Sequence, residues 1–173
     1  MRSCRKILSL CGMLSVILVS PKILNAFEIQ GVGINTTVSK AIDVLTPLCN
    51  KIENRKNQTY KMSDCKIGRH DNVVIILSYD GFVFKKIDGF QLLTTEFQGR
   101  RPDAWLDYFR GNTRTYVQRK EWSCSKPTLS NNETCEAQFT QDGGKAGGYK
   151  TYYYTVGVLR SNQGNVFYIE ASS

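Results

Sequence analysis

The sequence predicts an α+β fold in which one or two helices pack across a curved antiparallel β-sheet that carries two disulfides. Three features support this prediction: helical periodicity near residue 40, β-rich runs separated by turn residues from residue 72 onward, and four cysteines outside the N-terminal leader. The 147 residues after position 26 suit one domain, in which residues 27–100 and 101–173 could form two subdomains sharing a core.

Residues 1–26 have the pattern of a secretory signal peptide. Basic residues precede the apolar run ILSLCGMLSVILVS at 7–20, and Ala26 provides a small residue at the cleavage position. The run is shorter than the ~20 apolar residues that span a bilayer, so we expect cleavage after Ala26 rather than a retained anchor. The protein is therefore expected to be secreted or periplasmic.

The leader carries half of the net charge. The chain has 23 Lys and Arg against 15 Asp and Glu, a formal charge of +8, and four of the basic residues but none of the acidic ones lie in the leader. The mature chain is therefore at +4. Because this excess is mild for a protein that binds nucleic acid, we expect no specific nucleic-acid partner.

Cys49, Cys65, Cys124 and Cys135 remain after cleavage, and an even set in an oxidising compartment predicts two disulfides. The sequence leaves three pairings open. We prefer the local one, Cys49 with Cys65 and Cys124 with Cys135, because each closes a loop for which the chain-entropy model gives about 3 kcal/mol. A zinc site is the rival interpretation, but C-x2-C spacing is absent, and we predict neither a metal nor a cofactor.

The folded part is expected to open with a strand and an amphipathic helix. Phe27 and Ile29, followed by the glycines of GVG, predict a strand that ends at a tight turn. The hydroxyls of TTVS at 36–39 can cap the helix. Apolar residues then recur at spacings of four, three, four and three along one helical face: Val38, Ile42, Leu45, Cys49 and Ile52. Pro47 is expected to kink this helix or to begin a second short one.

A β-hairpin is expected next. Residues 72–79 form a β-rich run, Asp80-Gly81 a two-residue turn, and residues 82–87 the returning strand. The apolar run VVIIL at 73–77 is typical of a strand covered on both faces, with the first helix as one cover.

The second half is expected to hold one more helix and four strands. RRPDAWLDYFRGN at 100–112 predicts a helix that Gly111 ends. Strand candidates follow at residues 113–124, 134–140, 149–159 and 165–171. In the third of these, the period of two turns Tyr152 and Tyr154 toward the core and Tyr153 away from it.

GVGINTTVSKAIDVL at 31–45, in which glycine and a short apolar step precede a capped helix and then a sheet, resembles the opening of small exported domains of the outer-membrane assembly lipoprotein family (SmpA/BamE-like). This pattern covers residues 27–90. The organisation, with a helical element, strands and one local disulfide in each half, is similar to that of β-lactamase inhibitory proteins. The resemblance implies a protein-binding module whose concave sheet face receives a partner, and it assigns no residue a role.

Two groups of side chains are candidates for a partner-binding surface. A basic segment contains Arg100, Arg101, Arg110, Arg114, Arg119 and Lys120, with Asp103 and Asp107 interleaved. Such a segment suits an acidic protein or, peripherally, the lipid phosphates of a membrane surface, although a solvated helix face and strand edge is the simpler interpretation. Because alternation assigns Tyr152 and Tyr154 to the core, Tyr149 and Tyr153 are left as the aromatic candidates for interface anchors.

No set of residues specifies a reaction, so an enzyme is less expected than a binding protein. His70, the single histidine, lies in a predicted turn where a surface role is simpler. A secreted ribonuclease could combine His70, Glu96 and Arg114, which composition permits. The function we predict is an exported protein-binding module: an inhibitor, an immunity factor or an envelope-assembly accessory protein. The alternatives are a small secreted hydrolase or toxin using His70, and a carrier of lipid or a small ligand.

N-glycosylation sequons occur at Asn35, Asn57 and Asn132. They matter only if the protein passes through a eukaryotic secretory pathway.

Overall fold

The computed structural model describes residues 26–81, 85–95, 103–113, 116–126, 132–142 and 150–173. The helices are α1 (Val38–Leu45), a 3-10 helix (Thr46–Leu48) and α2 (Asp103–Asn112). The strands are β1 (Cys49–Arg55), β2 (Thr59–Ile67), β3 (His70–Tyr79), β4 (Ile87–Thr94), β5 (Val117–Ser125), β6 (Glu133–Asp142), β7 (Thr151–Ser161) and β8 (Gly164–Ser172). The predicted antiparallel sheet and two disulfides are confirmed. The two α-helices are short, 8 and 10 residues, so the fold is more β than the α+β prediction implied.

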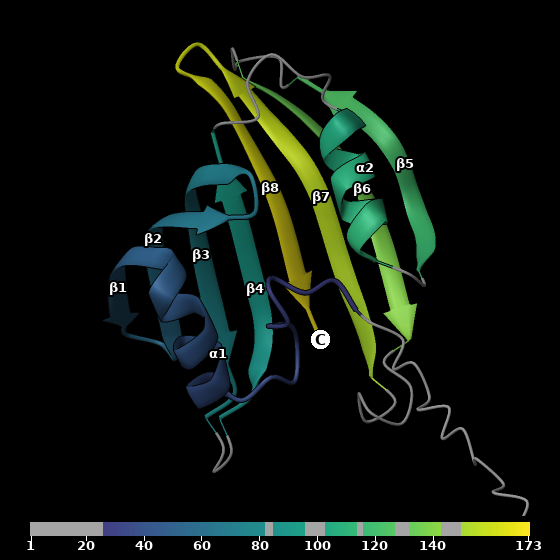
Figure 1. Ribbon diagram of the computed structural model, residues 1–173. Helices are drawn as coiled ribbons and strands as arrows, with labels where there is room; N and C mark the ends of the chain where they lie inside the picture. The colour runs from purple at the N-terminus through teal and green to yellow at the C-terminus, as the bar shows by residue number, and fades with distance from the viewer. Residues whose placement is uncertain (1–25, 82–84, 96–102, 114–115, 127–131, 143–149) are drawn as a thin grey trace, which may run out of the picture.

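The eight strands form one sheet in the order β1-β2-β3-β4-β8-β7-β6-β5 (Figure 1). Each half of the chain supplies a helix followed by four consecutive antiparallel strands. The last strands of the two halves, β4 and β8, pair at the centre from Gly89↔Ser172 to Thr94↔Phe167. The sheet is therefore continuous across both halves, while the predicted subdomain boundary at residues 100 and 101 lies outside the described residues.

Both helices lie over the same face of the sheet (Figure 1). Trp105 and Phe109 of α2 are fully buried, and the ring of Phe109 lies 4.9 Å from that of Phe139 on β6. The indole nitrogen of Trp105 donates a hydrogen bond of 2.8 Å to the backbone carbonyl of Tyr168 on β8. Helix α1 buries Leu45 against the other half of the same face. The core thus lies between the helices and one side of the sheet.

The opening segment fills the space between the two helices. The ring of Phe27 stacks on Phe90 of β4 at 5.8 Å and on Phe109 of α2 at 5.5 Å, so it joins side chains from both halves. The strand predicted here is only a bridge between Ile29 and Val32 around a tight turn. The Phe27 side chain therefore packs in the core between the two halves, and Phe27 is not part of the sheet.

The first helix is shorter than predicted. Helix α1 ends at Leu45, and Pro47, which has no backbone N–H to donate, lies in the 3-10 helix that follows. Cys49 and Ile52, predicted on the helical face, instead belong to β1, where Ile52 is paired with Met62 of β2. The apolar residues after Pro47 keep a helical spacing by coincidence. Strand pairing and the disulfide place them in β1 instead.

The hairpin prediction is correct for β3 and wrong for its partner. β4 begins at Ile87, so the connection is longer than the predicted two-residue turn, and residues 82–84 lie outside the described part. The Asp80 carboxylate accepts a bond of 2.8 Å from the Lys86 N–H and closes the loop. The prediction that both faces of this strand are covered is also wrong, because Ile75 on one face is buried whereas Val74 and Ile76 on the other are half-buried.

The second half follows the prediction closely. Helix α2 and strands β5 to β8 occupy the predicted segments, although α2 continues through Gly111 to Asn112. The disulfides have the preferred local pairing, Cys49–Cys65 between β1 and β2, and Cys124–Cys135 between β5 and β6. In the described part of the chain, neither helix has the length and apolar character required to cross a bilayer.

Candidate binding face

The sheet has one face without helices among the described residues. Along β7, Tyr152 and Tyr154 are buried beneath the helices, whereas Tyr153 and Thr155 point to the opposite side. We call that side the open face. The residues of strands β3 to β8 that lie on the open face include Ile76, Ser78, Gln91, Arg119, Lys120, Glu136, Gln138, Tyr153, Thr155, Tyr168 and Glu170.

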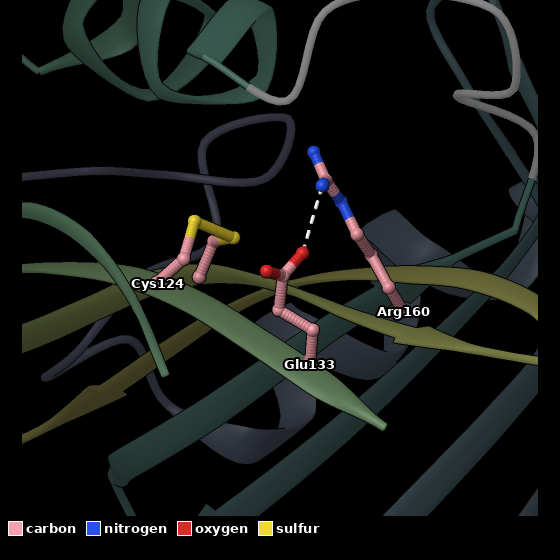
Figure 2. Close-up of a disulfide and its surroundings, with 4 residues drawn as sticks. Cys124, Glu133 and Arg160 are labelled. Carbon is pink, nitrogen blue, oxygen red and sulfur yellow. Dashed lines mark hydrogen bonds and ion pairs between the residues drawn. A yellow bond between two sulfur atoms is a disulfide. The ribbon is translucent and has the colours of Figure 1, made fainter. Parts of the chain in front are cut away.

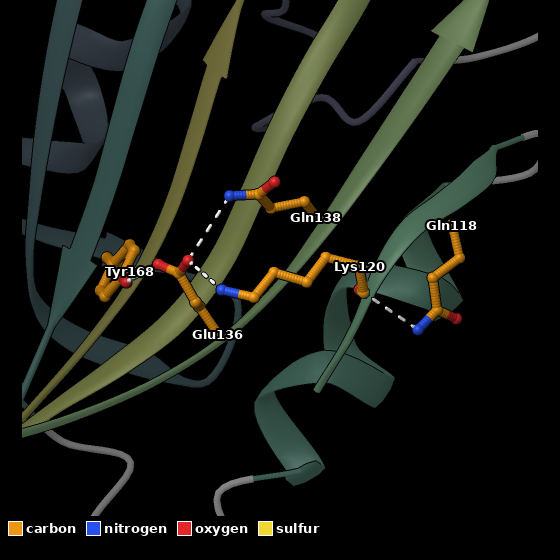
Figure 3. A network of polar contacts seen from close by, with 5 residues as sticks. All are labelled: Gln118, Lys120, Glu136, Gln138 and Tyr168. Atoms are coloured by element: carbon orange, nitrogen blue, oxygen red, sulfur yellow. Dashed lines mark hydrogen bonds and ion pairs between the residues drawn. The ribbon is translucent and has the colours of Figure 1, made fainter. Parts of the chain in front are cut away.

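A polar network crosses the open face from β8 to β5 (Figure 3). Glu136 on β6 is its centre: Lys120 Nζ donates to Oε1 at 2.9 Å, Gln138 Nε2 donates to the same oxygen at 3.4 Å, and the Tyr168 hydroxyl donates to Oε2 at 3.2 Å. The bond from Lys120 is the main cause that lowers the pKa of Glu136. Burial, and then the charge of Glu136, raise the pKa of Tyr168, which therefore remains a donor at neutral pH.

Gly157 makes this network possible. It is paired with both Glu136 on β6 and Tyr168 on β8, so it lies between the two side chains that meet. A Cβ at Gly157 would be 2.4 Å from Cζ of Tyr168. The tyrosine ring therefore lies across β7 in space that only glycine leaves free.

Two hollows of about 500 Å³ each flank Tyr153 on the open face. The first, over β3, β4 and β8, is lined by Ser78, Gln91 and Glu170 among others. The second lies over β5, β6 and β7 beside Arg119. Tyr153 lines both hollows and is 56% exposed, which makes it a ridge between them.

A β-bulge turns two cations to the open face. Gln118 is paired with Phe139 and Lys120 with Gln138, so Arg119 is an extra residue on β5. Nε of Arg119 donates a bond of 2.9 Å to the Thr140 hydroxyl, while Lys120 reaches Glu136. In a regular strand these two neighbours would point to opposite faces.

The structure separates the basic residues predicted as one segment. Arg119, Lys120 and Tyr153 lie on the open face, whereas Arg110 lies on α2, on the helix side, and donates to the side-chain amide oxygen of Gln118 at 3.2 Å. The other candidates lie outside the described residues: Arg100, Arg101, Arg114 and Tyr149.

Sequence reasoning missed Glu136, Tyr168 and Glu170 as members of this face. Alternation in TCEAQFT and NVFYIEA assigns all three to the side opposite the buried apolar residues, so this signal was present. Their contacts depend on strand register. Gln91 Nε2 on β4, for example, donates to Glu170 Oε1 on β8 at 3.0 Å.

His70 lies in the aromatic packing of the helix side. Its ring meets those of Tyr108 and Trp105 edge-on, with centroids 5.3 Å and 6.2 Å away. The other two residues of the ribonuclease hypothesis, Glu96 and Arg114, lie outside the described part of the chain. The position of His70 favours a packing role between β3 and α2.

One group of metal-ligand residue types, Cys124, Glu133 and Cys135, is accounted for by other bonds (Figure 2). The two sulfurs form a disulfide, and the Glu133 carboxylate accepts a bond of 2.8 Å from Arg160. An oxidised cysteine pair provides no thiolate for a metal. The disulfide therefore joins β5 to β6 and the ion pair joins β6 to β7, and these three residues do not form an ion site.

Two of the sequons differ in their surroundings. The side-chain amide nitrogen of Asn35 donates to the Tyr152 hydroxyl, whereas Asn57 is exposed in the turn between β1 and β2. Asn35 thus has a structural role that a glycan on the same nitrogen would disturb.

No family model, no curated protein and no solved structure matches this chain. The resemblance of residues 27–90 to exported binding domains stays a prediction, and function has to be inferred from the geometry.

Proposed function

We propose that the protein is an exported, disulfide-stabilised module that binds another protein through the open face, as an inhibitor, an immunity factor or an envelope-assembly accessory protein. One observation carries the proposal: a single sheet is packed on one side and bare on the other among the described residues. The bare side combines exposed Tyr153, charged groups and two hollows. Tyrosine and arginine are the residue types that most often anchor protein interfaces.

The face is built to be rigid. A disulfide fastens the hairpin at each outer side of the sheet, β1–β2 and β5–β6. The network around Glu136 joins side chains on three strands, β5, β6 and β8. A surface that is ordered before binding loses less conformational entropy when the partner arrives.

The edges of the sheet are less suited to binding than its face. β5 has register shifts on both sides of Lys120, and bulges of this kind disrupt the row of backbone groups that another strand would need. β1, the other edge, carries the ion-paired residues Lys51, Glu53 and Arg55. Charged edge residues oppose the addition of a further strand.

The alternatives gain no specific support from the described residues. A hydrolase using His70 would have to act from within a group of packed aromatic rings. A carrier needs a cavity under the sheet, whereas the hollows beside Tyr153 lie on the open face.

The test is capture of a partner by the oxidised protein, immobilised and exposed to envelope and culture-fluid extracts of the source organism. Thr155→Trp places a large neutral ring between the hollows and is expected to abolish retention of a stoichiometric protein. Ser39→Trp adds the same side chain at an exposed position of α1 and is expected to leave retention unchanged. Retention by Thr155→Trp, or no retained protein at physiological salt, would contradict the proposal.

A further inference from the structure

We propose that the hollow beside Arg119 and Tyr153 is a site for a carboxylate side chain, an Asp or Glu carried on a loop of the partner protein. This inference rests on the proposed function and adds the chemistry of the partner. It makes Arg119 the residue that selects an acidic loop.

Arg119 is held in place but keeps part of its binding capacity. Its Nε donates to Thr140 Oγ1 at 2.9 Å, which fixes one edge of the guanidinium. Among the described residues, no carboxylate oxygen lies within 4.0 Å of Arg119, whereas Lys120 on the same face is paired with Glu136 at 2.9 Å. The terminal nitrogens of Arg119 are therefore the part of the group that can bind a ligand.

The chemistry of the site suits a carboxylate. Two terminal guanidinium nitrogens form parallel hydrogen bonds with a carboxylate, an arrangement that lysine cannot reproduce. Around this position the hollow is lined by Gln138, Thr151, Tyr153 and Thr155. Tyr153 would cover one side of a bound acid, and partial exclusion of water strengthens a charge-assisted bond.

The other charges on the open face favour a protein loop over an anionic membrane. Glu136 and Glu170 are on the same face, and they would repel a continuous layer of lipid phosphates. On the other side of Tyr153, Glu170 and Asp88 line the first hollow, where they can accept hydrogen bonds from donor groups of the partner. A loop lying across Tyr153 can place its acid over Arg119 and its donors over the first hollow.

The experiment uses a phage-displayed library of disulfide-closed peptide loops selected on the oxidised protein at about 0.15 M salt, where exposed charges beyond ~8 Å are screened. Selected loops are expected to share an Asp or Glu at one position. Arg119→Gln, or amidation of that loop acid, should weaken binding about tenfold or more, since hydrogen bonds to charged groups are stronger than those between neutral groups. Arg110→Gln on the helix side is the matched control and should leave the affinity unchanged.

The outcomes separate this inference from the proposed function. Loops that lose binding in Thr155→Trp but carry no preferred acid, or bind Arg119→Gln normally, overturn the carboxylate site and leave open-face binding standing. If Thr155→Trp has no effect on the selected loops, or no loop is enriched, both proposals fail. Circular dichroism of each variant shows that a lost affinity is not lost folding.

Discussion

The ring of Tyr168 lies over Gly157, so close that a Cβ there would be 2.4 Å from Cζ of the tyrosine. This contact links β8 to Glu136 on β6 across the strand between them. The arrangement depends on one residue without a side chain, and it gives the open face a fixed polar centre.

Gly157→Ala is therefore expected to displace Tyr168 and to destabilise the fold by about 1–3 kcal/mol through overpacking. Denaturant unfolding measures the loss. The matched control is Gly111→Ala in α2, where nothing lies within 4 Å of an added Cβ and helix propensity favours alanine. In a Tyr168→Ala background the penalty of Gly157→Ala should disappear, and a penalty that persists there would show that Tyr168 is not its cause.

The bond from Lys120 predicts a pH dependence of stability. Because the pKa of Glu136 is lowered from the ordinary 4.5, its contribution is present above pH 4.5 and is lost as the pH falls through the folded pKa. Glu136→Gln should lower the free energy of unfolding at neutral pH, and the difference from wild type should shrink in acid. Lys120→Gln should reduce the same difference. Parallel pH profiles for wild type and Glu136→Gln would contradict this account.

Phe27 is expected to be the most costly single truncation in the opening segment. It is 1% exposed and contacts rings from both halves of the chain, so Phe27→Ala should cost about 3–5 kcal/mol of unfolding free energy. Exposed Glu28→Ala is the neighbouring control and should stay near wild type. Equal stabilities of the two variants would mean that the segment is not part of the core.

Each disulfide is expected to stabilise the fold by on the order of 3 kcal/mol, since the sequence separations are 16 and 11 residues. Replacing Cys49 and Cys65 together by Ala, or Cys124 and Cys135 together, separates their contributions in denaturant unfolding. If neither double substitution lowers the unfolding midpoint, the rigidity of the outer hairpins no longer supports the proposed binding face.

The second half could be predicted from the sequence because its signals are local. Tyr152 and Tyr154 alternate with exposed neighbours over a long strand, and Trp105 and Phe109 lie on one side of a helix. Strands β1 and β2 were missed because their solvent-facing positions are polar and the apolar spacing of the preceding helix continues into β1. Asp64, with φ of 53°, also interrupts the alternation within β2.

The binding face could be predicted only in part. Alternation places Tyr153 outward, as expected. The bulge that turns Arg119 to the same side as Lys120 appears only in the register between β5 and β6. The glycine contact of Tyr168 likewise depends on strands that are adjacent in space.

The most direct test of the account is NMR mapping of the isotope-labelled protein with the captured partner. The account predicts that the largest amide shift changes occur on the open face, around Tyr153, Thr155 and Gln138, with α1 and α2 little changed. Changes concentrated on the helices, with the open face unaffected, would contradict it.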